Sequence, residues 1–274
     1  MLISHNGTMQ EATLTPSPYT PRNRTMPMDG INNLVLTIRQ TYCFQQVNPD
    51  ATGKALDANN NLVTVNAWVP ARWEEVCNNF ILVAKQHWDN RFCLRIPASF
   101  QGYNYSHNQN EYRPCIHCRY DAVRVNTPQS GSINVQVVDV PTGSRFRAHA
   151  RLWTSQDTTL KTNFTGNQQI TVVHEVGHNL GSDHVNGAGN GLPNYGGVGT
   201  YNSRNIMGGG MVFEGWNAYS WQKAMEHMTR VSFAQWEGFL GTTLTPVWVR
   251  RLSFMENMFY RMGEAQMYAT PFPA

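Results

Sequence analysis

The sequence predicts an α/β fold of the α+β kind, in which one chain contains both strands and helices. Several runs rich in β-branched and aromatic residues indicate strands, and residues 71–88 carry apolar side chains at helical spacing. The length of 274 residues allows a substantial buried core. It is typical of one large domain or of two subdomains.

The first half of the chain predicts two strands and a helix. Residues 34–47 and 62–69 have strand composition, and the turn-rich segment between them predicts a hairpin with a long tip. In residues 71–88, apolar residues recur every three or four positions, which indicates a helix whose apolar face packs on a sheet. Residues 91–96 are expected to form a short strand.

The middle of the chain predicts further strands. Residues 97–119 have loop composition, whereas 120–125 and 133–140 have strand composition. Residues 145–153 alternate apolar and basic side chains, which is typical of a half-buried strand. Its basic face either guides an acidic substrate or is simply solvated, and amphipathic strands in general favour the second interpretation.

Composition bounds the class of protein. The net charge is only +3, too small to predict binding to nucleic acid or to a membrane surface. No apolar run approaches the 18 residues expected of a membrane-spanning helix. Residues 1–30 are polar and rich in proline and threonine, so they predict a flexible tail without the apolar segment of a signal peptide. Three explanations stay open: the protein is exported by a non-standard route, the sequence is a mature form, or the protein acts inside the cell.

The cysteine pattern leaves the redox state open. Five cysteines precede residue 120, and an odd number means that at least one thiol has no partner within the chain. The CxxC formed by Cys115 and Cys118 is either a local disulfide or half of a zinc site completed by His107 or His117. No second CxxC follows, which favours reduced or locally paired thiols. The five residues are Cys43, Cys77, Cys93, Cys115 and Cys118.

The strongest chemical signal is the run from residue 174 to residue 184, which reads HExxHxxGxxH. In a helix predicted over residues 168–180, His174 and His178 are one turn apart on one face, so they can bind one zinc ion. Gly181 can then adopt a left-handed turn that brings His184 back as a third ligand. Three protein ligands leave one position for water, as catalytic zinc sites do. Glu175 lies beside the first ligand, where a general base belongs.

This run resembles the metzincin clan of zinc metallopeptidases, and most of all its reprolysin version. Metzincins also have a methionine-containing turn below the zinc, and Met207, in the segment Asn-Ile-Met-Gly, matches it. Val185, directly after the third histidine, fits no common metzincin family. Gly209 stands where astacins and serralysins have a tyrosine, so the resemblance implies no tyrosine at the zinc.

The resemblance implies a mixed twisted sheet with an active-site helix, followed by a smaller, irregular and helical C-terminal subdomain. Residues 31–184 would form the upper subdomain, with 133–140 as an antiparallel edge strand over the cleft. Residues 185–262 would form the lower subdomain, with the methionine turn and a helix over 216–230. A second helix over 247–262 either packs on the core or binds a partner, and 263–274 are expected to be a tail.

The expected function is that of a zinc metalloendopeptidase with one catalytic Zn²⁺ and a peptide or protein substrate. The alternatives are a non-catalytic zinc-binding module of a larger assembly and a protease effector delivered by an injection apparatus. A delivery or assembly partner would bind through the N-terminal tail or through residues 247–262.

Overall fold

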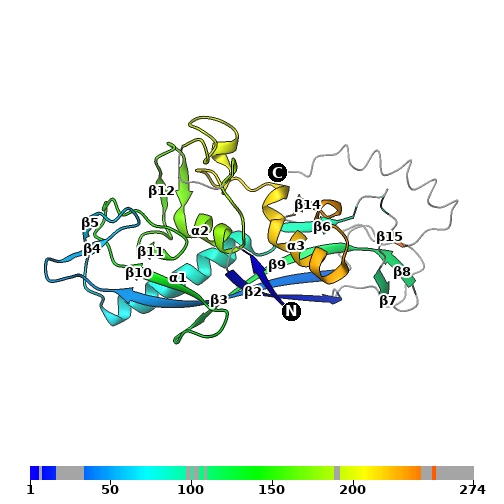
Figure 1. The fold of residues 1–274 in the computed structure, drawn as a ribbon, viewed down its shortest axis with the longest axis horizontal. Helices are drawn as coiled ribbons and strands as arrows, with labels where there is room; N and C mark the ends of the chain where they lie inside the picture. The colour runs from blue at the N-terminus through cyan, green and yellow to red at the C-terminus, as the bar shows by residue number, and fades with distance from the viewer. Residues whose placement is uncertain are drawn as a thin grey trace.

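The computed structural model describes residues 1–5, 8–16, 34–96, 100, 105–107, 110–187, 192–241 and 249–250. Within these ranges, three α-helices pack against a mixed eight-stranded sheet (Figure 1), which confirms the predicted fold class. The strands of this sheet are β1 (Leu2–His5), β2 (Thr8–Pro16), β3 (Leu34–Val47), β6 (Phe92–Arg95), β9 (Cys115–Val125), β10 (Ile133–Val138), β11 (Leu152–Thr154) and β14 (Glu237–Leu240). The α-helices are α1 (Pro70–Trp88), α2 (Thr171–Asn179) and α3 (Tyr219–Thr229).

The remaining described elements are short. They are the strands β4 (Lys54–Leu56), β5 (Leu62–Thr64), β7 (Tyr105–His107), β8 (Asn110–Arg113), β12 (Leu160–Thr162), β13 (Gln168–Ile170) and β15 (Val249–Arg250), with the 3₁₀ turns η1 (Asn202–Arg204), η2 (Gly215–Ala218) and η3 (Phe233–Gln235).

The long strand β3 organises the sheet and runs along most of its length in Figure 1. It has the bounds that the sequence predicts. On one side it pairs in parallel with β9. On its other side it pairs with antiparallel β2 along its first half and with parallel β10 along its second half. Its alternate residues, such as Leu36, Ile38 and Tyr42, are buried, because one face of the strand meets the helices.

Helix α1 confirms the helix predicted over residues 71–88, and the proline at its first turn suits a helix start. Its apolar stripe is core, as predicted: Phe80 and Trp88 are fully buried. The Trp88 indole N–H donates to the Val173 carbonyl of α2 at 2.9 Å. This bond and the shared core hold α2 against α1, and thereby place the HExxH segment.

The N-terminal prediction is wrong for residues 2–16. Instead of a flexible tail, β1 and β2 form a hairpin whose second strand pairs with β3 from Glu11 to Pro16. Ala12 is buried in this position. The segment has few apolar residues, but the backbone hydrogen bonds of a sheet edge do not require them. The rest of the predicted tail, residues 17–30, lies outside the described residues.

Two predicted strand pairings are also wrong. The short strand β5 pairs with β4, so the hairpin is local and does not include β3. Strand β10 is not an antiparallel edge strand, because it lies between β3 and β11 and is parallel to both. Of the expected strand 145–153, only residues 152 and 153 belong to the sheet, as part of β11. The alternation of apolar and polar residues along a strand does not determine which strand it pairs with, because pairing joins segments that are distant in the sequence.

Three further boundaries differ from prediction. Strand β9 begins at Cys115, inside the predicted loop. Residues 168–170 form strand β13, so the helix starts only at Thr171. Near the C-terminus, α3 confirms most of the helix predicted over 216–230. The helix predicted over 247–262 instead has Val249 and Arg250 in strand β15, and its other residues lie outside the described part of the chain.

Candidate metal centre

Helix α2 forms where burial outweighs weak helix propensity. Its β-branched residues Val172, Val173 and Val176 are fully buried in the main core. The helix ends in a Schellman motif, in which the Ser182 N–H bonds to the Gly177 carbonyl at 3.0 Å and Gly181 has a φ of 89°. The left-handed turn that the motif predicts at Gly181 is therefore present.

This turn brings the three predicted histidines together. The Nε2 atom of His178 lies 3.1 Å from Nε2 of His174 and 3.1 Å from Nε2 of His184. The ligand atoms of all three lie within 4.8 Å of one another. Two of the rings come from one face of α2, and the third comes from the segment after the turn.

The hydrogen bonds of the other ring nitrogens show that these residues suit a metal. The Nδ1–H of His174 donates to the Ile206 carbonyl at 2.7 Å, and that of His178 donates to the Ser182 carbonyl at 2.8 Å. A neutral imidazole has one N–H, so both Nε2 atoms present lone pairs to the centre. Tetrahedral nitrogen ligands about 2.0–2.1 Å from zinc are roughly 3.3–3.4 Å apart, close to the spacing found here.

The electrostatic surroundings also suit metal ligation. Burial, with the neighbouring charge of His178, holds the pKa of His174 well below its usual value. Burial likewise lowers the pKa of His178, although the bond to Ser182 and the charge of Asp183 oppose this. Histidine binds a metal only in its neutral form, so these shifts favour binding at neutral pH.

Glu175 lies beside the histidines without joining the ligand cluster. Burial, with the nearby charge of Asp157, raises the pKa of its carboxyl to about 8. Glu175 lines an open cavity of about 400 Å³ together with His178, His184 and residues 147–150. The cavity gives a ligand access to the histidines and to this carboxyl group.

Met207 lies directly beneath α2, as the resemblance implies. Its side chain is fully buried, and a Cβ atom at position 177 would overlap its sulfur atom. Gly177 is therefore required for this close approach. The Met207 backbone N–H donates to Asn205 Oδ1 at 2.8 Å, which fixes the turn below the histidines.

Gln169 is a buried residue of this site that the sequence analysis missed. Its amide Nε2 lies 3.1–3.2 Å from the carbonyl oxygens of Ile206, Gly208 and Gly210, which share its two N–H groups. It thus connects β13 to the methionine turn and to the carbonyl that orients His174. A single glutamine before a helix carries no sequence signal for this role.

Tyr195 is the second missed residue. Its ring centroid lies 3.9 Å from that of His184, and its ring is nearly parallel to that of His174 at 5.6 Å. Burial, with the nearby Glu175, raises the pKa of its hydroxyl to about 12, so it is protonated at neutral pH. Tyr195 lies in the loop before Met207. The resemblance to metzincins predicted no site residue at this position.

The CxxC segment does not form a local disulfide. Cys115 and Cys118 belong to one extended strand and are three residues apart, so their side chains point to opposite faces. Cys118, like Cys43, Cys77 and Cys93, is a buried free thiol. Across the described part of the chain, the three histidines are the one group able to hold a metal, but the side chain of His107 lies outside it.

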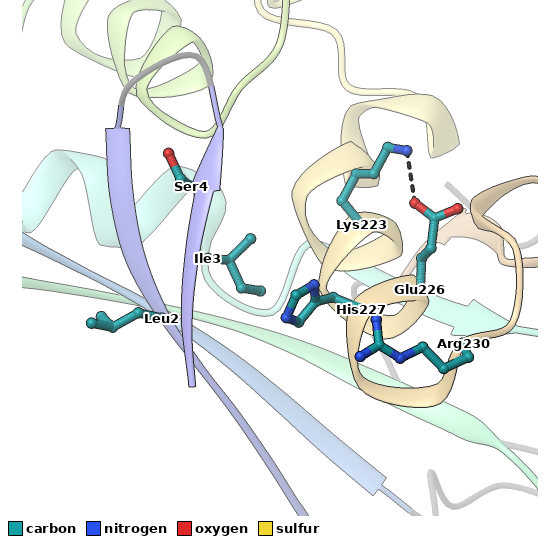
Figure 2. A pocket seen from close by; sticks show the side chains of 7 residues that line it. All are labelled: Leu2, Ile3, Ser4, Lys223, Glu226, His227 and Arg230. Carbon is teal, nitrogen blue, oxygen red and sulfur yellow. Dashed lines mark hydrogen bonds and ion pairs between the residues drawn. The ribbon is translucent and has the colours of Figure 1, made fainter.

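A separate hollow lies between β1 and α3 (Figure 2), and His174, His178 and His184 do not line it. Lys223 of α3 and Arg230, directly after that helix, line it, and Lys223 is paired with Glu226 at 2.8 Å. None of the predicted site residues contributes to it, so the three-histidine cavity remains the candidate functional site.

In the described residues no helix combines the length and the apolar character needed to cross a bilayer.

The comparisons with known proteins leave the family open. The chain matches no protein-family model, and searches of curated proteins and of solved structures found no significant similarity.

Proposed function

We propose that this protein is a zinc-dependent metalloendopeptidase of the metzincin type. The observation that carries the proposal is the convergence of the Nε2 atoms of His174, His178 and His184 beside the buried Glu175, at an open cavity. A purely structural zinc site has four protein ligands. Three ligands, a non-ligating carboxyl group and access for a ligand are what hydrolysis requires.

The roles of the residues follow from their positions. His174, His178 and His184 would hold a zinc ion, which would supply the Lewis acidity that activates water and polarises a carbonyl group. The charge of a bound zinc ion would oppose the burial that raises the pKa of Glu175, and the ionised carboxylate would then accept the proton of the attacking water and pass it to the leaving amine. The carbonyls of Ile206 and Ser182 keep His174 and His178 in the ligating tautomer.

The surroundings support the metzincin assignment. Met207 lies under the helix at Gly177, and Gly181 makes the turn that the motif requires. One part of the assignment changes: β10 is internal to the sheet, so residues 147–150 line the cavity in place of an antiparallel edge strand.

The test is proteomic cleavage-site profiling of the purified protein, with zinc content measured in parallel. We expect about one zinc per chain, cleavage of peptides, and loss of cleavage with a chelator. Glu175→Ala should keep zinc and the fold but lose roughly 10²–10⁴-fold in rate, since it removes a positioned general base. His178→Ala should lose both zinc and activity.

Two outcomes contradict the proposal. If Glu175→Ala cleaves as fast as the wild-type protein, the proposed general base is wrong. If the zinc-loaded wild type cleaves nothing in a broad peptide library, a non-catalytic zinc-binding module becomes the better interpretation.

A further inference from the structure

The cavity beside the three histidines has a basic wall. Arg147 and His149 line it, together with Glu175 and His178. The backbone of Arg147 is anchored: its carbonyl accepts from the Ala58 N–H at 3.0 Å, and its N–H bonds to the Asp57 carboxylate. The side chain therefore projects from a fixed point on the cavity wall.

The guanidinium of Arg147 has no hydrogen-bond or ion-pair partner among the described residues, and the side chain is exposed. By contrast, Arg39, Arg119 and Arg124 are each paired with a carboxylate. Burial raises the pKa values of Glu175 and Tyr195, and the charge of Arg147 partly opposes that rise, so it acts on the interior of the cavity. An unpaired arginine in this position suits a carboxylate of a ligand.

The neighbouring acidic groups do not neutralise this wall. The Asp57 carboxylate is buried and accepts backbone N–H groups of Asn59 and Asn61 at 2.8–2.9 Å, as well as that of Arg147. Asp183 lines the same cavity as Arg147, and it also lines a second cavity of about 690 Å³ that Arg147 does not line. In the described part of the chain neither carboxylate forms an ion pair with the Arg147 guanidinium, so this guanidinium can bind an anion.

We propose that Arg147 selects peptides with an aspartate or glutamate side chain next to the scissile bond. This inference rests on the proposed function, because it assigns a substrate class to the same site. Hydrogen bonds to charged groups contribute about 1.5–3 kcal/mol, so a matched Glu-to-Gln change in the peptide should cost roughly 10-fold or more in affinity.

Binding tests the proposal without turnover. Zinc-loaded Glu175→Ala protein is titrated with two fluorescent peptides that differ only by Glu or Gln beside the intended scissile bond. We expect tighter binding of the Glu peptide, a smaller preference at high salt, and loss of the preference when Arg147→Ala is added. Arg145→Ala is the matched control: Arg145 is exposed, two residues away, and outside the cavity lining, so the preference should survive.

The inference is overturned if the protein binds the two peptides equally well, or if it binds neither of them. An equal loss for both peptides in Arg147→Ala also overturns it, because Arg147 would then act on groups common to all substrates. If the wild type cleaves both peptides equally well, the protease proposal stands and only this inference fails. If it cleaves neither peptide but still binds the Glu peptide better, Arg147 selects acidic peptides without their hydrolysis, so the protease proposal and the placement next to a scissile bond fail while the preference for an acidic side chain stands.

Discussion

The histidine cluster depends on polar residues that never touch the metal position. Gln169 is the clearest example, because the two N–H groups of one buried amide are shared among three carbonyls of the turn that contains Met207. Asn163 supports it by donating to Gln169 Oε1 at 3.1 Å and to the Gly209 carbonyl at 2.8 Å. Such outer contacts orient metal ligands and tune their affinity.

We therefore expect Gln169→Leu to weaken both the fold and the metal site. The change leaves buried carbonyls without donors, which costs about 1–3 kcal/mol in the free energy of unfolding. Zinc affinity should fall roughly 10–100-fold, because the Ile206 carbonyl that orients His174 loses its support. Chemical denaturation and zinc competition with a chelating dye measure the two effects.

The control for this change is Gln168→Leu, one residue earlier and exposed. It should change neither quantity by much. Unaltered zinc affinity in Gln169→Leu would show that the methionine turn keeps its position without the amide.

At the scale of elements, the N-terminal hairpin is a part of the sheet. Strand β2 covers the edge of β3 that β10 leaves open, since the two strands pair with successive halves of β3 on the same side. An uncovered edge of this length would present free backbone groups to other chains. The hairpin also reaches α3, where Gln10 donates to Ser220 at 3.4 Å.

A substitution pair tests whether the hairpin is docked. Ala12 is 1% exposed and faces the core, whereas the next residue, Thr13, is exposed. Ala12→Glu buries a carboxyl group and should cost at least a few kcal/mol. At about 2–4 °C per kcal/mol for a chain of this size, Tm should fall by roughly 5–10 °C in a thermal scan.

Thr13→Glu provides the control, because it adds the same charge on the solvent side, and Tm should change little. A similar, small effect of both substitutions would mean that the hairpin is not part of the cooperative fold.

At the scale of the whole molecule, ion pairs join separate elements around the sheet. Asp121 of β9 accepts from Arg39 of β3 at 2.8 Å and from Lys85 of α1 at 2.9 Å. Burial by itself would raise the pKa of Asp121, but the bonds from Lys85 and Arg39 outweigh it and lower the pKa. The three residues lie on separate elements, so the pairs form only in the folded chain.

The lowered pKa makes part of the stability depend on pH. A carboxyl group whose folded pKa is depressed stabilises the fold above its unfolded pKa of about 3.9, and this contribution is lost as pH falls through the folded value. Asp121→Asn should therefore lower the free energy of unfolding by about 1 kcal/mol at pH 7. The difference from wild type should vanish towards pH 2–3, as urea titrations across pH can show. A difference that is constant with pH would mean that the ion pairs contribute nothing.

The sequence by itself determined the chemistry of the candidate site. The spacing of His174 and His178 fixes their common face through helix geometry, and Gly181 permits the turn to His184. These are local relations among eleven residues, so no knowledge of the fold is needed. The same holds for α1 and β3, whose patterns are long and regular.

Only the tertiary structure decided what surrounds that site. Gln169, Tyr195 and Arg147 reach it from β13, from the loop before Met207 and from the segment before β11, and no local pattern connects these positions. The parallel pairing of β10 and the docking of β2 are likewise choices of partner strand. Such contacts between distant segments are fixed by the packing of the whole chain, whereas the periodicity of one segment shows only which of its faces is buried.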